Sequence, residues 1–73
     1  MDKQQEALRK LGRRLTQLRQ QQDLTLAQLA THTGIDSREL AAIEAGETDP
    51  PITTILAICR GLGLPPAEWL DIK

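Results

Sequence analysis

Histidine and cysteine, the side chains most often used as nucleophiles, general bases and metal ligands, occur once each in this chain of 73 residues. A lone Cys59 cannot form an internal disulfide, and with a single histidine the chain lacks the residues for a zinc site or a catalytic triad. We expect Cys59 to be a packed small side chain and His32 a surface residue near the end of a helix. The sequence therefore predicts no enzyme, no metal and no cofactor.

Hydrogen bonding to the edges of nucleic-acid bases needs none of these groups, and one arginine is well placed for it. Leu40 and Ile43 define the buried side of a helix predicted over residues 37–45, at about 100° per residue. The residues opposite them are Arg38, Ala41, Ala42 and Ala45. A guanidinium can donate two hydrogen bonds to guanine, while alanines permit close approach to a thymine methyl group. Ser37, at the start of this helix, can reach a base or a phosphate.

Two short helices must position these side chains, and the same local pattern begins both. A residue that caps a helix is followed three positions later by Gln or Glu, with apolar residues on either side of the pair. The pairs are Thr25 with Gln28 and Asp36 with Glu39. Each pair predicts a capping box with a hydrophobic staple. Gly34 lies between them, where the first helix must end in a positive φ. The spacing is typical of a helix-turn-helix.

The remaining chain extends this pattern to a small all-α domain. Apolar periodicity and turn residues predict five helices, over residues 3–22, 26–33, 37–45, 52–62 and about 66–71. In the fourth, the predicted apolar stripe is Ile52, Ile55, Leu56, Cys59 and Leu62. We expect a single domain over residues 1–73, with the helix-turn-helix at about 25–45 and two helices at about 52–71. Trp69 is the only aromatic residue. Without a membrane span or a secretory signal in the sequence, we expect a cytoplasmic protein.

Charge is unevenly distributed along the chain. The net charge is −1, but residues 1–23 carry six Lys or Arg against three acids, and the remaining residues carry three against seven. The basic residues lie mainly on the outer face of the first predicted helix, where a solvated surface is the simplest explanation. They are not expected to contact nucleic acid.

A longer stretch, LGRRLTQLRQQQDLTLAQLATHTGIDSRELAAIEAGETDPPITTILAICRGLGL, resembles the lambda-repressor/Cro-like (Xre) helix-turn-helix family. The matching landmarks are Arg19, the LAQLA segment, Gly34-Ile35, Ile43-Glu44, Gly46, Pro50 and residues 55–64. The tail AICRGLGLPPAEWL is further similar to small stand-alone members such as controller proteins of restriction-modification systems. The resemblance implies that the helix at residues 37–45 enters the major groove of double-stranded DNA, and that the start of the preceding helix and the loop after residue 45 meet phosphates.

The resemblance predicts a sequence-specific transcriptional regulator that acts as a homodimer. The DNA-binding residues would be Thr25, Gln28, Ser37, Arg38, Ala41 and Ala42. For Thr25 and Gln28, a purely structural capping role is an equal alternative to phosphate contact. Glu47 and Asp49 stand where relatives commonly carry Lys or Arg, and their charge weakens binding to phosphates. The alternative is a protein–protein interaction module, or the N-terminal fragment of a larger regulator, with the same fold.

Two further expectations concern contacts between helices. Arg19 and Glu44 lie at the margin between the core and the surface of their helices, and in relatives this pair forms an ion pair under the helix-turn-helix. We expect the same ion pair here. Trp69 and Leu70 are predicted to form a two-fold dimer interface together with the exposed flank of the preceding helix, because a short chain offers little to pack against them. The alternative for Trp69 is a lid over the core of the monomer.

Overall fold

A computed structural model describes residues 2–70 of the chain. Over these residues it has five α-helices, joined by short loops, and no strand. The helices are α1 (Lys3–Gln21), α2 (Leu26–Thr33), α3 (Ser37–Glu44), α4 (Ile52–Leu62) and α5 (Pro66–Leu70). The all-α fold class is therefore confirmed, and the helix ends agree with the sequence to within one residue over α1–α4. The predicted end of the fifth helix at about residue 71 lies outside the described residues. None of the helices between residues 2 and 70 has the length and apolar character needed to cross a membrane.

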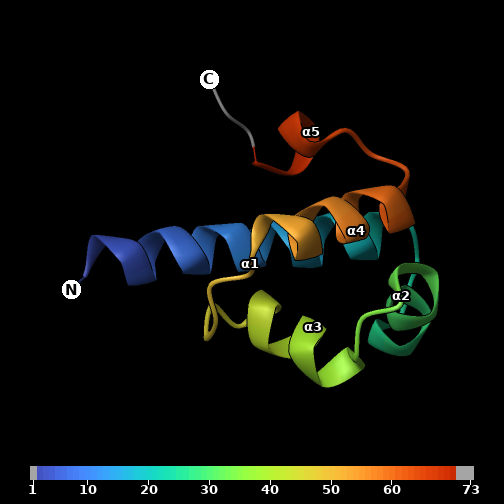
Figure 1. The fold of residues 1–73 in the computed structure, drawn as a ribbon, viewed down its shortest axis with the longest axis horizontal. Helices are drawn as coiled ribbons and strands as arrows, with labels where there is room; N and C mark the ends of the chain where they lie inside the picture. The colour runs from blue at the N-terminus through green and yellow to red at the C-terminus, as the bar shows by residue number, and fades with distance from the viewer. Residues whose placement is uncertain (1, 71–73) are drawn as a thin grey trace.

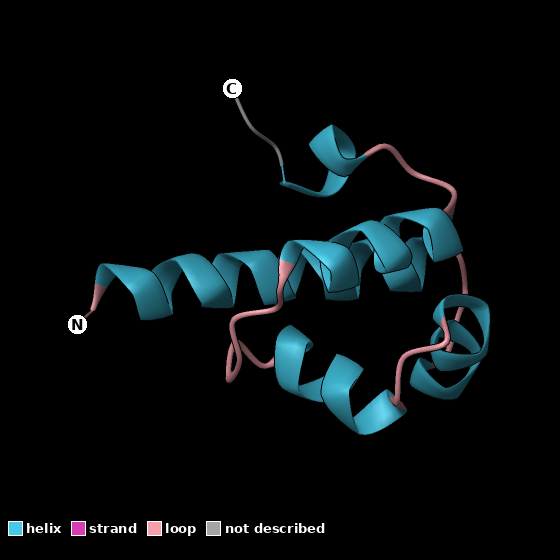
Figure 2. Cartoon of the chain, viewed as in Figure 1, coloured by secondary structure: helices cyan, strands magenta, loops and turns pink. Residues whose placement is uncertain are grey.

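The helices pack around a shared core, with two of them in the middle. Figures 1 and 2 show α1 and α4 lying across the middle of the molecule, with α2 and α3 on one side and α5 on the other. α1 packs against both α3 and α5, while α2 contacts α3 and α4. The outward side of α3 thus lies across the molecule from α5.

The start of α2 is built as its sequence predicts. Thr25 Oγ1 accepts a hydrogen bond from Gln28 N at 3.0 Å, and Gln28 Oε1 accepts one from Thr25 N at 2.8 Å, so the capping box is complete. Gly34 ends the helix at φ 75°, in the left-handed region that a glycine adopts without strain.

The start of α3 differs from its prediction. Asp36 Oδ1 accepts a hydrogen bond from Arg38 N at 2.8 Å, rather than from the backbone of Glu39. Only α2, among the helices of residues 2–70, has a reciprocal capping box. The second capping box predicted from the sequence is therefore wrong: the Asp36 carboxylate caps α3 at the N–H two positions on, as the Asp2 carboxylate does at Gln4 N in α1.

Trp69 belongs to the core of the single chain. Its side chain is 1% exposed, and Nε1 donates a hydrogen bond to the Leu11 carbonyl at 3.1 Å. The premise that a short chain leaves Trp69 nothing to pack against is therefore wrong, and Trp69 is the lid over the monomer core. The reason is that α5 folds back onto α1, whose Leu11 is 58 positions earlier in the chain. Leu70 is half-buried beside it.

The buried face of α4 is rotated relative to the predicted stripe. Its core residues are Ile55, Ile58, Cys59 and Leu62. Ile52 and Leu56, which the sequence placed on the apolar stripe, are 60% and 37% exposed. They are the large apolar side chains that residues 2–70 leave exposed. The two lie on one flank of α4 because α2 and α5 cover the other side of the helix.

Candidate nucleic-acid interface

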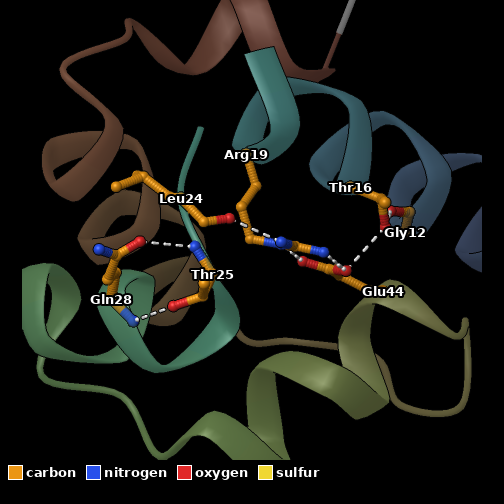
Figure 3. Close-up of polar contacts among 7 residues, drawn as sticks. All are labelled: Gly12, Thr16, Arg19, Leu24, Thr25, Gln28 and Glu44. Atoms are coloured by element: carbon orange, nitrogen blue, oxygen red, sulfur yellow. Dashed lines mark hydrogen bonds and ion pairs between the residues drawn. The ribbon is translucent and has the colours of Figure 1, made fainter. Parts of the chain in front are cut away.

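The orientation of α3 depends on a guanidinium–carboxylate pair beneath the helix-turn-helix. Arg19 Nε lies 2.7 Å from Glu44 Oε2, and Arg19 Nη2 donates to Glu44 Oε1 at 3.1 Å (Figure 3). The two side chains are only 14% and 10% exposed. The ion pair predicted from the sequence is therefore present, with two parallel hydrogen bonds. The hydrogen bond to Glu44 raises the pKa of Arg19 above its already high ordinary value, so Arg19 is charged near neutral pH.

Two more groups complete this network. The Arg19 Nη1 group donates to the Leu24 carbonyl at 2.7 Å, which ties α1 to the residue before the N-cap of α2. The Thr16 hydroxyl lies 2.8 Å from Glu44 Oε1 and donates to it, although the Gly12 carbonyl at 3.1 Å competes for the same proton. One arginine thus joins α1, the start of α2 and the end of α3 (Figure 3). The network fixes the two helices relative to each other before any ligand binds.

A glycine in α1 allows the two helix backbones to meet at this point. A Cβ atom on Gly12 would overlap the backbone carbonyl groups of Ile43 and Glu44. Gly12 is the buried glycine of α1, and the sequence analysis missed both it and Thr16. The signal was available for Gly12, since a glycine inside a long helix often marks a close approach. Thr16 has no comparable signal, because its partner is 28 positions away in the chain.

The outward face of α3 is formed by a single cation among small side chains. The Arg38 side chain is 93% exposed. Ala41 and Ala45 are exposed, whereas Ser37 and Ala42 are half-buried. Leu40 and Ile43 face the core at 0% and 1% exposure. The helix thus presents a narrow, low-relief surface from which one long guanidinium projects, a shape that suits insertion into a groove.

Thr25 and Gln28 are exposed at the start of α2, but their side chains are already engaged with each other. The hydroxyl oxygen of Thr25 and the amide oxygen of Gln28 are both used as acceptors in the capping box. The Gln28 amide nitrogen, a donor, is the group that could reach a phosphate. A capping role and a phosphate contact are therefore compatible at Gln28.

The electrostatics around α3 are unusual for a surface that meets DNA. Arg38 is the single Lys or Arg between residues 24 and 59, a segment that also contains Asp36, Glu39, Glu44, Glu47 and Asp49. Glu44 is paired with Arg19, whereas Glu47 and Asp49 are exposed in the loop after α3. Such a surface would gain little from phosphate neutralisation, so a DNA complex would depend on specific contacts for much of its affinity.

Cys59 and His32, the two isolated reactive side chains, both have a structural role. Cys59 is buried on α4, and burial raises the pKa of its thiol, which keeps it neutral and slow to react. His32 is exposed at the end of α2, and its Nδ1 lies 2.8 Å from the Gln28 carbonyl oxygen. Because a carbonyl only accepts, Nδ1 must carry the proton. Within residues 2–70, no three His, Cys, Asp or Glu side chains gather as a metal site would require.

Comparison with known proteins places this geometry in a family. A family model described as a helix-turn-helix domain matches residues 10–70. The transcriptional regulator SutR of Escherichia coli (strain K12) is 40% identical over 61 residues, which cover 84% of this chain and 34% of SutR. The chain thus spans about a third of the length of that curated relative.

Solved structures give the same result in three dimensions. The restriction-modification controller protein C.AhdI from Aeromonas hydrophila superposes with a TM-score of 0.83 at 31% identity, over 85% of this chain and 94% of that protein. An HTH_3 family transcriptional regulator from Vibrio cholerae superposes with a TM-score of 0.89 at 28% identity, over 93% of this chain and 38% of that protein. Both agree with the predicted resemblance to lambda-repressor/Cro-like (Xre) proteins. The chain belongs to the helix-turn-helix domain family.

Proposed function

We propose that this chain is a cytoplasmic transcriptional regulator that binds double-stranded DNA as a homodimer and places α3 in the major groove. The observation that carries the proposal is the exposed face of α3, where Arg38 projects from a helix held in place by the Arg19–Glu44 pair. SutR and the Vibrio cholerae protein are both named transcriptional regulators, which supports the same function here.

Arg38 has the principal role in sequence recognition in this proposal. Its guanidinium would donate two hydrogen bonds to N7 and O6 of a guanine, while Ala41 and Ala42 allow α3 to approach the bases closely. Ser37 and Gln28 would contact phosphates and set the register of the helix in the groove. Thr25 would act mainly by capping α2, since its hydroxyl oxygen already accepts from Gln28 N.

The proposed dimer surface is the flank of α4 formed by Ile52 and Leu56, together with half-buried Leu70 of α5. A dimer would present two copies of α3 to half-sites about one helical turn apart. Trp69 supports this surface from within the core instead of contacting the partner.

Selection from random DNA, followed by binding measurements at two salt concentrations, tests the proposal. The wild-type protein should enrich a two-fold symmetric motif. Arg38→Ala should cost about 1–3 kcal/mol per half-site and relax the preference at one base pair. Arg13→Ala, which removes the same charge from the exposed face of α1, is the matched control and should leave the motif unchanged. If Arg38→Ala instead weakens binding to all sequences alike, Arg38 contacts a phosphate.

A protein–protein interaction module is the second candidate. Two observations favour it: the acidic loop beside α3, and the greater length of SutR and the Vibrio cholerae regulator. The same selection separates the candidates, since an interaction module would enrich no DNA motif.

A further inference from the structure

Asp36 makes two contacts with the same neighbour. Its Oδ1 accepts a hydrogen bond from the Arg38 backbone N at 2.8 Å, which caps α3. The same oxygen lies 3.7 Å from Arg38 Nε, within the range of an ion pair. The side chains of Asp36 and Arg38 are 58% and 93% exposed, so the pair stands on the outward side of the helix start. One carboxylate therefore links the backbone of α3 to its only guanidinium.

The position of this carboxylate determines which donors of Arg38 remain available. A guanidinium can present either Nε with one terminal nitrogen, or its two terminal nitrogens, to a pair of acceptors. Asp36 lies on the Nε side, which leaves the terminal nitrogens at the outer end of the side chain. Two parallel donors are what the N7 and O6 acceptors of guanine require. A guanidinium held in this way also loses less rotamer freedom when it binds a base.

The charge of Asp36 has a second effect. A phosphate that approaches Arg38 also approaches the Asp36 carboxylate, and the two negative groups repel each other. The neutral edge of a guanine is not repelled in this way. The pair therefore disfavours the sequence-independent contact relative to the base contact.

We propose that Asp36 is a positioning residue for DNA recognition: its carboxylate orients Arg38 toward guanine and lowers the affinity of the same side chain for phosphate. The inference rests on the function proposed above. Asp36 then has a role beyond helix capping, and the discrimination between guanine and other bases depends on Asp36 and Arg38 together.

Asp36→Asn separates capping from charge, because asparagine caps helices as well as aspartate does. The thermal stability of the full chain should therefore be unchanged. Affinities are measured for the selected site, for the same site with the Arg38-dependent guanine replaced by adenine, and for DNA of random sequence. Asp36→Asn should bind random DNA more tightly and should lose about threefold in guanine-over-adenine discrimination per half-site, the order expected for an exposed ion pair.

Glu47→Gln is the matched control, since it removes one exposed carboxylate from the loop after α3. It should raise the affinity for all DNA and leave the discrimination unchanged. The Asp36→Asn change should also have no effect on discrimination in an Arg38→Ala background, because the positioned group is then missing.

Three results would overturn the inference, and one of them would also overturn the proposed function. If the wild-type protein enriches no motif, the proposed function fails together with the inference. If it enriches a motif and Asp36→Asn retains full discrimination, only the positioning role is wrong. If Asp36→Asn alters discrimination equally in the Arg38→Ala background, Asp36 contacts the DNA itself and does not act through Arg38.

Discussion

Arg19 is the residue on which the helix-turn-helix geometry most depends. Its guanidinium donates from Nε, Nη1 and Nη2, and so satisfies both oxygens of Glu44 and the Leu24 carbonyl. Because the pKa of Arg19 is raised, its contribution to stability is complete at all pH values below the ordinary arginine pKa and is lost only above it. Titration of Arg19 therefore adds no pH dependence to stability near neutrality.

Removal of the Glu44 carboxylate should be strongly destabilising. Glu44→Ala leaves the Arg19 guanidinium largely buried without its counter-charge and also removes the nearer of the two acceptors of the Thr16 hydroxyl. We expect a loss of roughly 3 kcal/mol in the free energy of unfolding, measured by urea denaturation followed by far-UV circular dichroism. Glu44→Gln should lose less, because its amide oxygen still accepts one hydrogen bond. An unchanged midpoint for Glu44→Ala would contradict this role.

At the scale of the helices, two glycines determine how closely neighbouring elements pack. Gly12 brings α1 against the backbone at the end of α3, where no side chain can move aside to admit a Cβ atom. Gly61 brings α4 against the end of α2, and a Cβ atom there would lie 2.5 Å from the methyl group of Thr33. Close packing thus accounts for a residue that by itself disfavours the middle of a helix.

The close contact between Gly61 and the Thr33 methyl group can be tested, because a second substitution removes that methyl group. Gly61→Ala should destabilise the protein by about 1 kcal/mol, since the cost of overpacking exceeds the gain in helix propensity. In a Thr33→Ser background the methyl group is absent, while a serine hydroxyl can still donate to the Leu29 carbonyl as Thr33 does at 2.9 Å. The same substitution should then be neutral or stabilising in thermal unfolding. Equal losses in the two backgrounds would show that the Thr33 methyl group is not the obstacle.

At the scale of the whole molecule, the arrangement separates two surfaces. α3 presents Arg38 on one side of α1 and α4, and α5 covers the other side with Trp69 in the core (Figure 1). The exposed apolar flank of α4, with Ile52 and Leu56, belongs to a different helix from either of these surfaces. In the proposed dimer this flank would be buried, so that association does not compete with DNA for α3.

A charge on this flank should weaken the proposed dimer without unfolding the chain. Ile52→Glu places a carboxylate at the first position of α4, where the helix dipole favours it, so thermal stability of the monomer should be retained. Sedimentation equilibrium should show a dimer for the wild type and a shift toward monomer for the variant. Thr53→Glu, an exposed neighbour in the same helical turn, is the matched control and should remain dimeric.

A monomeric wild-type protein at concentrations tenfold above those used for DNA binding would contradict the dimer. Trp69→Ala is unsuitable as an interface test, because removal of a fully buried tryptophan costs about 3–5 kcal/mol and would unfold much of so small a protein.

Local sequence rules determined most of the helix boundaries. Thr25 with Gln28 began α2, and Gly34 ended it, because capping and a positive φ depend on residues within a few positions. The Arg19–Glu44 contact could also be predicted, from the angular positions of both residues and from the family resemblance. Arg38 lies on the outward face because Leu40 and Ile43 fix the buried side of the same helix.

Tertiary packing decided what covers each helix flank. A helical stripe identifies the apolar side of α4 but not its edges, and only the positions of α2 and α5 bury Ile58 while leaving Ile52 exposed. Trp69 is buried because α5 folds back onto Leu11, and Gly12 is required because two backbones meet at α3. The contacts of Trp69 with Leu11 and of Gly12 with the end of α3 join residues more than thirty positions apart, and no local pattern in the chain specifies which distant surface a helix flank will meet.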